Sequence, residues 1–233
     1  MTTPDDIDDL VFLIDVDNTL LDNDRVIADL YRHIEKDFGA TEAGRYSDIL
    51  EALRSELGYV DYLGALQRYR AQESRRGMSD SRLLLLSGFL IDYPFADRLY
   101  PGALDALQKL GRHGPTVILS DGDVVFQPRK VQRAGLWDAT EGRVLIYVHK
   151  EQMLDVIEQI HPARHYVMID DKLRILSAMK ASWGDRLTTV FVRQGHYAFD
   201  TDAMVGLTPA DLTIEQIADL NHIDWAAVPG IQK

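Results

Sequence analysis

Five consecutive apolar residues, Leu10–Ile14, are followed directly by the acidic segment Asp15-Val16-Asp17. A short apolar run bounded by polar residues predicts a strand buried on both faces, as in the parallel sheets of α/β proteins. Ligands bind at the carboxyl ends of the strands in such sheets. Asp15 and Asp17 are two residues apart, so an extended backbone would point both side chains the same way. The alternative interpretation is that these acids only end the strand as turn residues.

Three further apolar runs also end in polar residues, and each predicts a strand. They cover residues 117–119, 144–149 and 166–169. In chain order they precede Ser120, Lys150 and the pair Asp170-Asp171. Since strand ends meet at one edge of a parallel sheet, these side chains are expected to converge with the first acidic pair.

Such a cluster would contain four acids, Asp15, Asp17, Asp170 and Asp171, against the single positive charge of Lys150. Carboxylates this close repel one another in a partly dry cleft unless a cation or a proton separates them. A hard divalent cation with oxygen ligands resolves the conflict, and Mg²⁺ is the expected metal. The alternative for Asp170 and Asp171 is that they only cap the following helix.

Helical periodicity dominates the segment from 23 to 98. Val26, Leu30, Ile34 and Phe38 form an apolar stripe, and Gly39 is expected to end that helix. Further helical patterns occur at residues 49–57, 62–69 and 83–90, and no convincing strand appears. The segment is therefore predicted to be an all-helical insertion.

Strands and helices alternate again after Tyr100. Additional strands are expected at 189–192 and 212–214, followed by a last helix. This alternation predicts an α/β fold with a doubly wound, mostly parallel, Rossmann-like sheet. Residues 1–22 and 99–233 would form the α/β core, and residues 23–98 the inserted helical domain.

Composition limits the possible environments and partners. The chain has 233 residues, no cysteine, 46% hydrophobic residues and a net charge of −12. A disulfide or thiolate zinc site is excluded, and so acidic a surface disfavours nucleic acid as a partner. No basic signal peptide and no run of about 20 apolar residues is seen, so the expectation is a cytoplasmic protein without a membrane partner. The sequence does not indicate an oligomeric state.

The order of these motifs resembles that of the haloacid dehalogenase-like hydrolase superfamily. An Asp-x-Asp-Asn-Thr segment is followed by a strand ending in Ser, then by Lys, then by a strand ending in two acids. The resemblance covers about residues 10 to 215. It implies that the first strand is central and is flanked by the second and the fourth. It also implies that the helical insertion is a cap, which closes over the core site and selects the leaving group.

The resemblance also implies residue roles. Asp15 would attack phosphorus and become an aspartyl phosphate, while Asp17 would be the general acid and base. Thr19 would orient the loop of Asp17. Ser120 and Lys150 would bind the phosphoryl group, with help from backbone N–H groups near Asp121 and Gly122. The metal would be held by Asp15, Asp171 and the backbone carbonyl of Asp17, and Asp170 would support it through water or through the other ligands.

The sequence departs from the family pattern in two places. No acid follows Asp171 at the spacing that many relatives show, and Lys150 is followed by Glu151 instead of the frequent proline. Lys130 and Lys172 are therefore alternatives to Lys150 as the lysine of this motif.

Several other residues are weaker candidates. Five of the cap arginines cluster along the sequence and form either a solvated face or a site for an anionic leaving group. They are Arg68, Arg70, Arg75, Arg76 and Arg82. Arg193 and His196 follow the strand at 189–192 and could approach the site. A metal pair of His161 and His165 is disfavoured, because Pro162 lies between them.

The sequence thus predicts a Mg²⁺-dependent phosphatase that hydrolyses a small phosphorylated metabolite. Two alternatives stay open. One is a carbon–halogen hydrolase of the same fold, against which Asp17 argues, because those relatives lack the second Asp. The other is a catalytically silent binding protein that keeps the fold.

Overall fold

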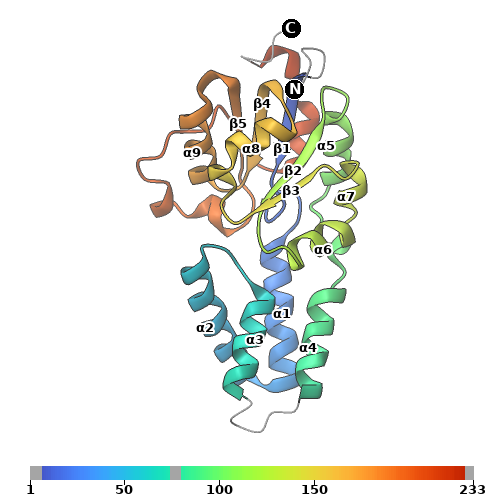
Figure 1. Ribbon diagram of the computed structural model, residues 1–233, viewed down its shortest axis with the longest axis vertical. Helices are drawn as coiled ribbons and strands as arrows, with labels where there is room; N and C mark the ends of the chain where they lie inside the picture. The colour runs from blue at the N-terminus through green and yellow to red at the C-terminus, as the bar shows by residue number, and fades with distance from the viewer. Residues whose placement is uncertain (1–6, 74–79, 229–233) are drawn as a thin grey trace.

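The computed structural model describes residues 7–73 and 80–228. Within them, six strands form one parallel sheet in the order β3-β2-β1-β4-β5-β6 (Figure 1). The strands are β1 (Asp8–Ile14), β2 (Thr116–Asp121), β3 (Val144–Tyr147), β4 (Ala163–Asp170), β5 (Leu187–Val192) and β6 (Leu212–Ile214). The predicted α/β class is confirmed, and β1 lies between β2 and β4 as expected.

Helices cover both faces of the sheet, which explains the continuous apolar run of β1. Leu10, Phe12 and Ile14 point into one core cluster, whereas Val11 and Leu13 point into the other. The first cluster includes residues of α5 (Ala103–Leu110) and α6 (Phe126–Arg133), and the second includes residues of α8 (Leu154–Ile160) and α9 (Leu173–Trp183). Both faces of the sheet are therefore buried at its centre.

Shorter helices complete the core. They are α7 (Leu136–Ala139) and the 3₁₀ helices η4 (Lys150–Gln152), η5 (Gly184–Arg186), η6 (His196–Phe199), η7 (Asp202–Met204), η8 (Ile217–His222) and η9 (Trp225–Ala227). The prediction of a last α-helix is wrong, because the described residues after β6 form only the short 3₁₀ helices η8 and η9.

The cap is an elongated group of four helices at one end of the molecule (Figure 1). Its helices are α1 (Asn23–Phe38), α2 (Ala40–Leu57), α3 (Tyr62–Glu73) and α4 (Asp80–Asp92), and η3 (Phe95–Arg98) leads back to the core. The described residues of this segment contain no strand, so the prediction of a helical insertion holds for them. Its division from the core at residues 22 and 99 stays a prediction.

Local sequence signals set the limits of α1. The Asp22 carboxylate accepts a hydrogen bond from the Arg25 backbone N–H at 2.9 Å, which satisfies one free donor of the first turn. Val26, Leu30 and Ile34 are buried along one face, as their spacing predicts. Gly39 has a φ of 93°, and its N–H donates to the Glu35 carbonyl, so the helix ends there.

The two chain segments that join cap and core pair with each other. Leu21 and Leu99 form an antiparallel bridge. The Asp22 N–H donates to the Arg98 carbonyl at 2.8 Å, and the Tyr100 N–H donates to the Leu20 carbonyl at 2.9 Å. The cap is thus attached through a short two-stranded neck, directly after the segment that carries Asp15 and Asp17.

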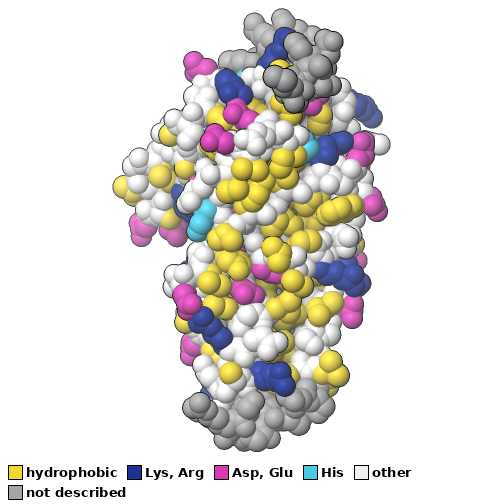
Figure 2. Space-filling model, viewed as in Figure 1, with side chains coloured by type: hydrophobic (Ala, Val, Ile, Leu, Met, Phe, Trp, Pro, Cys, Tyr) yellow, Lys and Arg dark blue, Asp and Glu magenta, His cyan; other side chains and the backbone are white. Residues whose placement is uncertain are grey.

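The exposed surface mixes apolar and charged groups. Figure 2 shows apolar side chains on both the core and the cap, with basic and acidic side chains scattered among them. None of the described helices combines the length and the apolar character that a membrane span requires.

Candidate active site

The carboxyl edge of the sheet carries the predicted site residues. Asp15 directly follows β1, Ser120 lies at the end of β2, and Asp170 ends β4. Lys150 begins η4, just beyond β3. Because β2, β1 and β4 are neighbours, the four side chains come from adjacent positions along this edge.

Lys150 is the lysine that contacts the first acid. Its Nζ lies 2.5 Å from Asp15 Oδ1 and 2.7 Å from Asp170 Oδ2, and it donates to the Leu119 carbonyl at 3.2 Å. The Lys150 backbone N–H donates to Asp121 Oδ1 at 2.9 Å. Burial opposes the charge of the Lys150 side chain, but attraction to Asp15, Asp170 and Asp121 outweighs it and raises the pKa. The ammonium is therefore held beside Asp15.

Three buried acids form a group with the spacing of a metal site. Asp15, Asp170 and Asp171 each offer an oxygen within 4.8 Å of the others. Asp15 Oδ2 and both oxygens of Asp171 have no hydrogen-bond partner among the described residues. Asp170 is already engaged, because its Oδ1 accepts from the Lys172 N–H and its Oδ2 faces Lys150. The free oxygens thus favour Asp15 and Asp171 as direct ligands.

Electrostatics shows why this group calls for a cation. Burial and the neighbouring Asp170 raise the pKa of Asp171 well above its usual value. Burial raises the pKa of Asp170 to about 6, although Lys150 opposes the shift. An unpaired buried carboxylate is costly, and a divalent cation with oxygen ligands would remove that cost. The donor set therefore fits Mg²⁺.

Asp17 faces a different set of partners. Lys130 Nζ lies 2.7 Å from Asp17 Oδ1 and 2.9 Å from Oδ2, and it donates to Asn23 Oδ1 at 3.1 Å. Gln127 Nε2 donates to Asp17 Oδ2 at 3.3 Å and to Ser120 Oγ at 2.9 Å. The Asp17 carboxylate is not one of the three that could share a metal, and the family resemblance assigned only its backbone carbonyl to that role.

Two predicted binding groups are less available than expected. The Gly122 N–H donates to the Tyr147 carbonyl at 2.8 Å, so its hydrogen is engaged within the core. A Cβ at Gly122 would lie 2.7 Å from that of Gln127, which indicates that this glycine allows close packing. Thr19 is fully buried, and its hydroxyl has no partner among the residues described.

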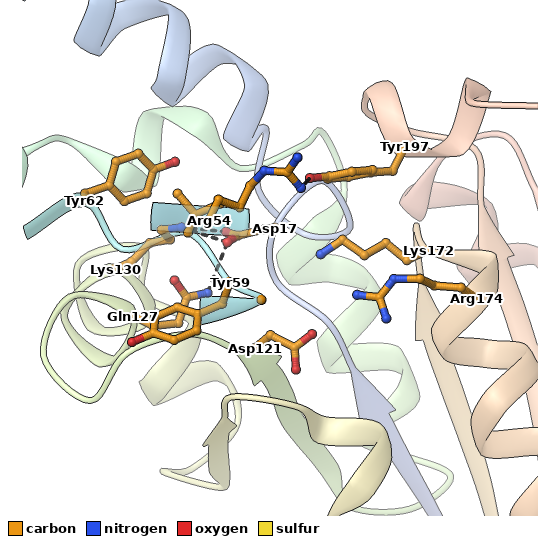
Figure 3. Close-up of a pocket in the computed structure, with 12 residues that line it drawn as sticks. Asp17, Arg54, Tyr59, Tyr62, Asp121, Gln127, Lys130, Lys172, Arg174 and Tyr197 are labelled. Carbon is orange, nitrogen blue, oxygen red and sulfur yellow. Dashed lines mark hydrogen bonds and ion pairs between the residues drawn. The ribbon is translucent and has the colours of Figure 1, made fainter. Parts of the chain in front are cut away.

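A pocket of about 120 Å³ opens beside Asp17, between cap and core (Figure 3). The cap contributes Arg54, from the last turn of α2, and four residues that lead into α3, namely Gly58, Tyr59, Val60 and Tyr62. The core contributes Asp17, Asp121, Gln127, Lys130, Lys172, Arg174 and Tyr197. A leaving group bound here would touch both domains.

The sequence did not single out the cap arginine that lines this pocket. Arg54 donates to the Tyr197 hydroxyl at 3.5 Å across the boundary between cap and core. Arg68 instead pairs with Glu56 on the surface, and neither it nor Arg70 lines the pocket. Arg75 and Arg76 lie outside the described residues, as does the side chain of Arg82.

Two further residues shape the loop of Asp17 and were missed. Asn18 has a φ of 61°, and its Oδ1 accepts from the backbone N–H groups of Asn23 and Asp24. Gln194 is buried and donates to the Thr19 carbonyl at 3.1 Å. Asn is one of the few residue types that adopt this left-handed conformation readily, which was the available signal for Asn18.

The weaker candidates are placed elsewhere. Arg193 pairs with Glu215, and His196 Nδ1 lies 2.6 Å from Asp24 Oδ1 at the start of α1. His165 lies near the beginning of β4, with its ring 2.9 Å from the Thr188 hydroxyl. None of these contacts involves the acid cluster.

Comparison with known proteins decides the family. Residues 10–182 match the model of the haloacid dehalogenase-like hydrolases. The chain belongs to this family. The match covers β1 through most of α9, and hence every residue of the acid cluster and both lysines that contact Asp15 or Asp17. The protein is therefore a hydrolase with the haloacid dehalogenase-like fold.

Individual relatives support the same assignment. A solved haloacid dehalogenase-like hydrolase from Burkholderia xenovorans is 65% identical, with a TM-score of 0.87 over 93% of this chain and 97% of that one. A trehalose-phosphate phosphatase from Mycobacterium leprae is 33% identical over 114 residues, 49% of this chain and 23% of that protein. This chain thus matches about a quarter of that relative's length.

Dehalogenases share the fold as well. The L-2-haloacid dehalogenase of Xanthobacter autotrophicus is 17% identical, with a TM-score of 0.57 over 91% of this chain and 96% of that one. At this identity the likeness concerns the fold alone.

Proposed function

We propose that the protein is a Mg²⁺-dependent phosphatase that hydrolyses a small phosphomonoester through an aspartyl-phosphate intermediate. The observation that carries the proposal is the pairing of Lys150 with Asp15 beside the partner-free oxygens of Asp171. This arrangement offers a nucleophile, a fixed positive charge and a set of metal ligands at one point. The similarity to a trehalose-phosphate phosphatase is consistent with it.

Asp15 is the proposed nucleophile. Its Oδ1 is held by Lys150 at 2.5 Å, and its Oδ2 has no protein partner among the described residues. One of these oxygens would attack the phosphorus atom, while the other would stay available to the metal. The bond from phosphorus to the leaving oxygen breaks as the bond to Asp15 forms. Lys150 and Ser120 would then bind the phosphoryl oxygens, since both side chains are fixed at the same sheet edge.

Asp17 is the proposed acid and base. It would protonate the leaving oxygen and then take a proton from the water that attacks the aspartyl phosphate. Both Asp17 oxygens accept from Lys130 in the structure, and Oδ1, which does not also accept from Gln127, keeps a second lone pair that can carry the proton for the leaving oxygen. The pocket beside Asp17 is where that leaving group would lie.

Asp15 and Asp171 would hold Mg²⁺ directly, and Asp170 would support them. When bound, the metal would offset the repulsion between the phosphoryl group and the carboxylates. Two lysines, Lys150 and Lys172, lie among the same acids and contribute fixed positive charge.

A carbon–halogen hydrolase is the competing function for this fold. It needs the Asp15 nucleophile but no acid for the departing halide, so it gives no role to Asp17 or to the free oxygens of Asp171. The presence of Asp17 in contact with Lys130, and of Asp171 with its partner-free oxygens, favours the phosphatase. It also disfavours a catalytically silent binding protein, which needs neither a general acid nor a set of metal ligands.

The test is turnover of p-nitrophenyl phosphate with Mg²⁺, with EDTA, and by Asp15→Asn. The amide cannot form an acyl phosphate, so the variant should fold and lose activity by at least about a thousandfold. EDTA should abolish wild-type turnover, and added Mg²⁺ should restore it. Near wild-type activity of Asp15→Asn would reject Asp15 as the nucleophile.

A further inference from the structure

One wall of the pocket beside Asp17 is formed by the cationic side chains of Arg54, Lys172 and Arg174 (Figure 3), named here the cationic wall. Arg54 belongs to the cap, whereas the other two lie at the start of α9 in the core. The protein has a net charge of −12, so a concentration of positive charge in its pocket requires an explanation.

The lining contains four cationic side chains, Arg54, Lys130, Lys172 and Arg174, against the two acids Asp17 and Asp121. The remaining cation, Lys130, is committed to Asp17 by two contacts shorter than 3 Å. The second acid, Asp121, accepts from the Lys150 backbone N–H. The lining therefore has a surplus of positive charge, and this surplus lies on the cationic wall.

Tyr197 connects the two halves of the wall. Its hydroxyl accepts from Arg54 Nη1 at 3.5 Å, and Lys172 Nζ lies 5.0 Å from the centre of its ring. A cap residue and a core residue are thus held against the same side chain, which places their charges on one side of the pocket.

The existing acid partners of the wall leave it available to a ligand. Arg54 pairs with Glu51, which is 60% exposed and does not line the pocket. Arg174 is 3.8 Å from Glu151. The solvent-exposed pair Arg54–Glu51 contributes little energy, and Glu151, which is 15% exposed, lies too far from Arg174 for a hydrogen bond. An anion in the pocket can therefore compete for both guanidinium groups. No hydrogen bond to Lys172 Nζ is found among the described residues.

The pocket does not include the attacking carboxylate, although Lys172 also lies close to it. Asp15 is only 3% exposed and does not line the pocket, whereas Asp17 does. The pocket therefore accommodates the part of the substrate beyond the phosphoryl group. Guanidinium groups match carboxylates and phosphates geometrically, so a leaving group that carries such an anion would satisfy the wall.

On the basis of the proposed phosphatase function, we infer that the leaving group carries a second anionic group, a carboxylate or a phosphate, bound by Arg54, Lys172 and Arg174. A neutral polyol would leave this surplus of charge without a partner.

Matched substrates test the inference. We would measure kcat/KM for alkyl phosphates of two, three and four carbons whose far end is a hydroxyl, a carboxylate or a second phosphate. For at least one chain length, the substrate with an anionic end should have a kcat/KM at least about tenfold higher than the substrate with a hydroxyl end. The anionic end that gives the higher kcat/KM, carboxylate or phosphate, identifies the chemical group that carries the second charge.

Variants assign the effect to the wall. Arg54→Gln and Arg174→Gln should each reduce the preference for the anionic end to about threefold or less. Arg68→Gln is the matched control, because Arg68 is a cap arginine outside the pocket and should keep the wild-type preference. Equal kcat/KM for the charged and neutral ends at every length would overturn the inference while leaving the phosphatase proposal intact.

Binding separates this inference from the proposed function. Calorimetry with the corresponding non-hydrolysable alkyl phosphonates, in the presence of Mg²⁺, needs no turnover. If no phosphate ester is hydrolysed, the phosphatase proposal fails. The anionic subsite would still be supported if the carboxyalkyl phosphonate bound at least about tenfold more tightly than the hydroxyalkyl phosphonate, and if this difference were lost in Arg54→Gln. Equal affinities would reject it.

Discussion

Lys130 Nζ contacts both carboxylate oxygens of Asp17, at 2.7 and 2.9 Å, and also reaches Asn23 Oδ1 at 3.1 Å. Asn23 is the first residue of α1, so one buried lysine joins the proposed acid to the cap. The aromatic rings of Tyr62 and Phe126 surround the ammonium, at 6.0 and 5.6 Å from their centres. Lys130 is therefore a positioning residue that couples Asp17 to the cap.

The first prediction concerns this coupling. Lys130→Met keeps the length of the side chain but removes its charge, so Asp17 loses its anchor. Misplacement of a reacting group costs about a hundredfold, and we expect a fall of that order in kcat with little change in KM.

Arg129→Met is the control, since Arg129 also lies on α6 and only approaches the exposed Asp92, at 3.6 Å. Circular dichroism and the melting temperature would show that both variants fold. If Lys130→Met kept the wild-type kcat, Lys130 would have no positioning role.

The second prediction concerns the metal. Ligand binding to the folded state stabilises it by RT ln(1 + [L]/Kd), about 2.7 kcal/mol at a hundredfold excess over Kd. Mg²⁺ should therefore raise the melting temperature of the wild type. Asp171→Asn removes the acid whose two oxygens have no partner among the described residues, and this shift should disappear.

Asp155→Asn is the matched control, because Asp155 is an exposed acid on α8. It should keep the full Mg²⁺-dependent shift. An equal shift in Asp171→Asn and the wild type would exclude Asp171 as a ligand.

The sequence predicted the acid cluster because its members directly follow buried strands. Once Leu10–Ile14 and the run before Asp170 are recognised as neighbouring parallel strands, their next residues must meet. Lys150 was harder to assign, since it lies beyond the short strand β3. Its reach to Asp15 depends on the conformation of η4, which periodicity does not indicate.

Other site residues depend on tertiary packing. Lys130 and Gln127 lie on α6, one turn apart, and only the docking of that helix brings them to Asp17. Arg54 was not distinguished from the other cap arginines, because the sequence does not show which end of α2 faces the core. Gly58, which ends α2 and packs against the ring of His149, was the available signal.

The third prediction concerns acid stability. His165 is 5% exposed, and burial lowers its pKa below the usual 6.5. The unfolded chain therefore binds a proton at a higher pH than the native state does. This contribution to stability is fully present above about pH 6.5, and it is lost as the pH falls from there toward the native pKa.

Urea unfolding at pH 7.5 and 5.5 checks this sign. His165→Gln should lose less stability between the two pH values than the wild type, because its side chain does not titrate. Comparing the two proteins cancels the contributions of other groups, including Asp170 and His161. An identical pH dependence in both would show that His165 does not contribute.

The last prediction separates a phosphatase from a dehalogenase through Asp17. An alkoxide is a poor leaving group and needs a proton, whereas p-nitrophenolate departs with little help. Asp17→Asn should therefore lower turnover of alkyl phosphates by about 10²- to 10⁴-fold, but should slow the phosphorylation step with p-nitrophenyl phosphate much less. The amide oxygen can still accept from Lys130, so the loop should keep its position.

The same variant should also trap the intermediate, because the water that attacks the aspartyl phosphate loses its base. Phosphorylated Asp15 should therefore accumulate on rapid quench in Asp17→Asn, whereas Asp155→Asn should show no such accumulation. Release of halide from 2-haloacids without Mg²⁺, with no phosphorylated enzyme, would reject the phosphatase function.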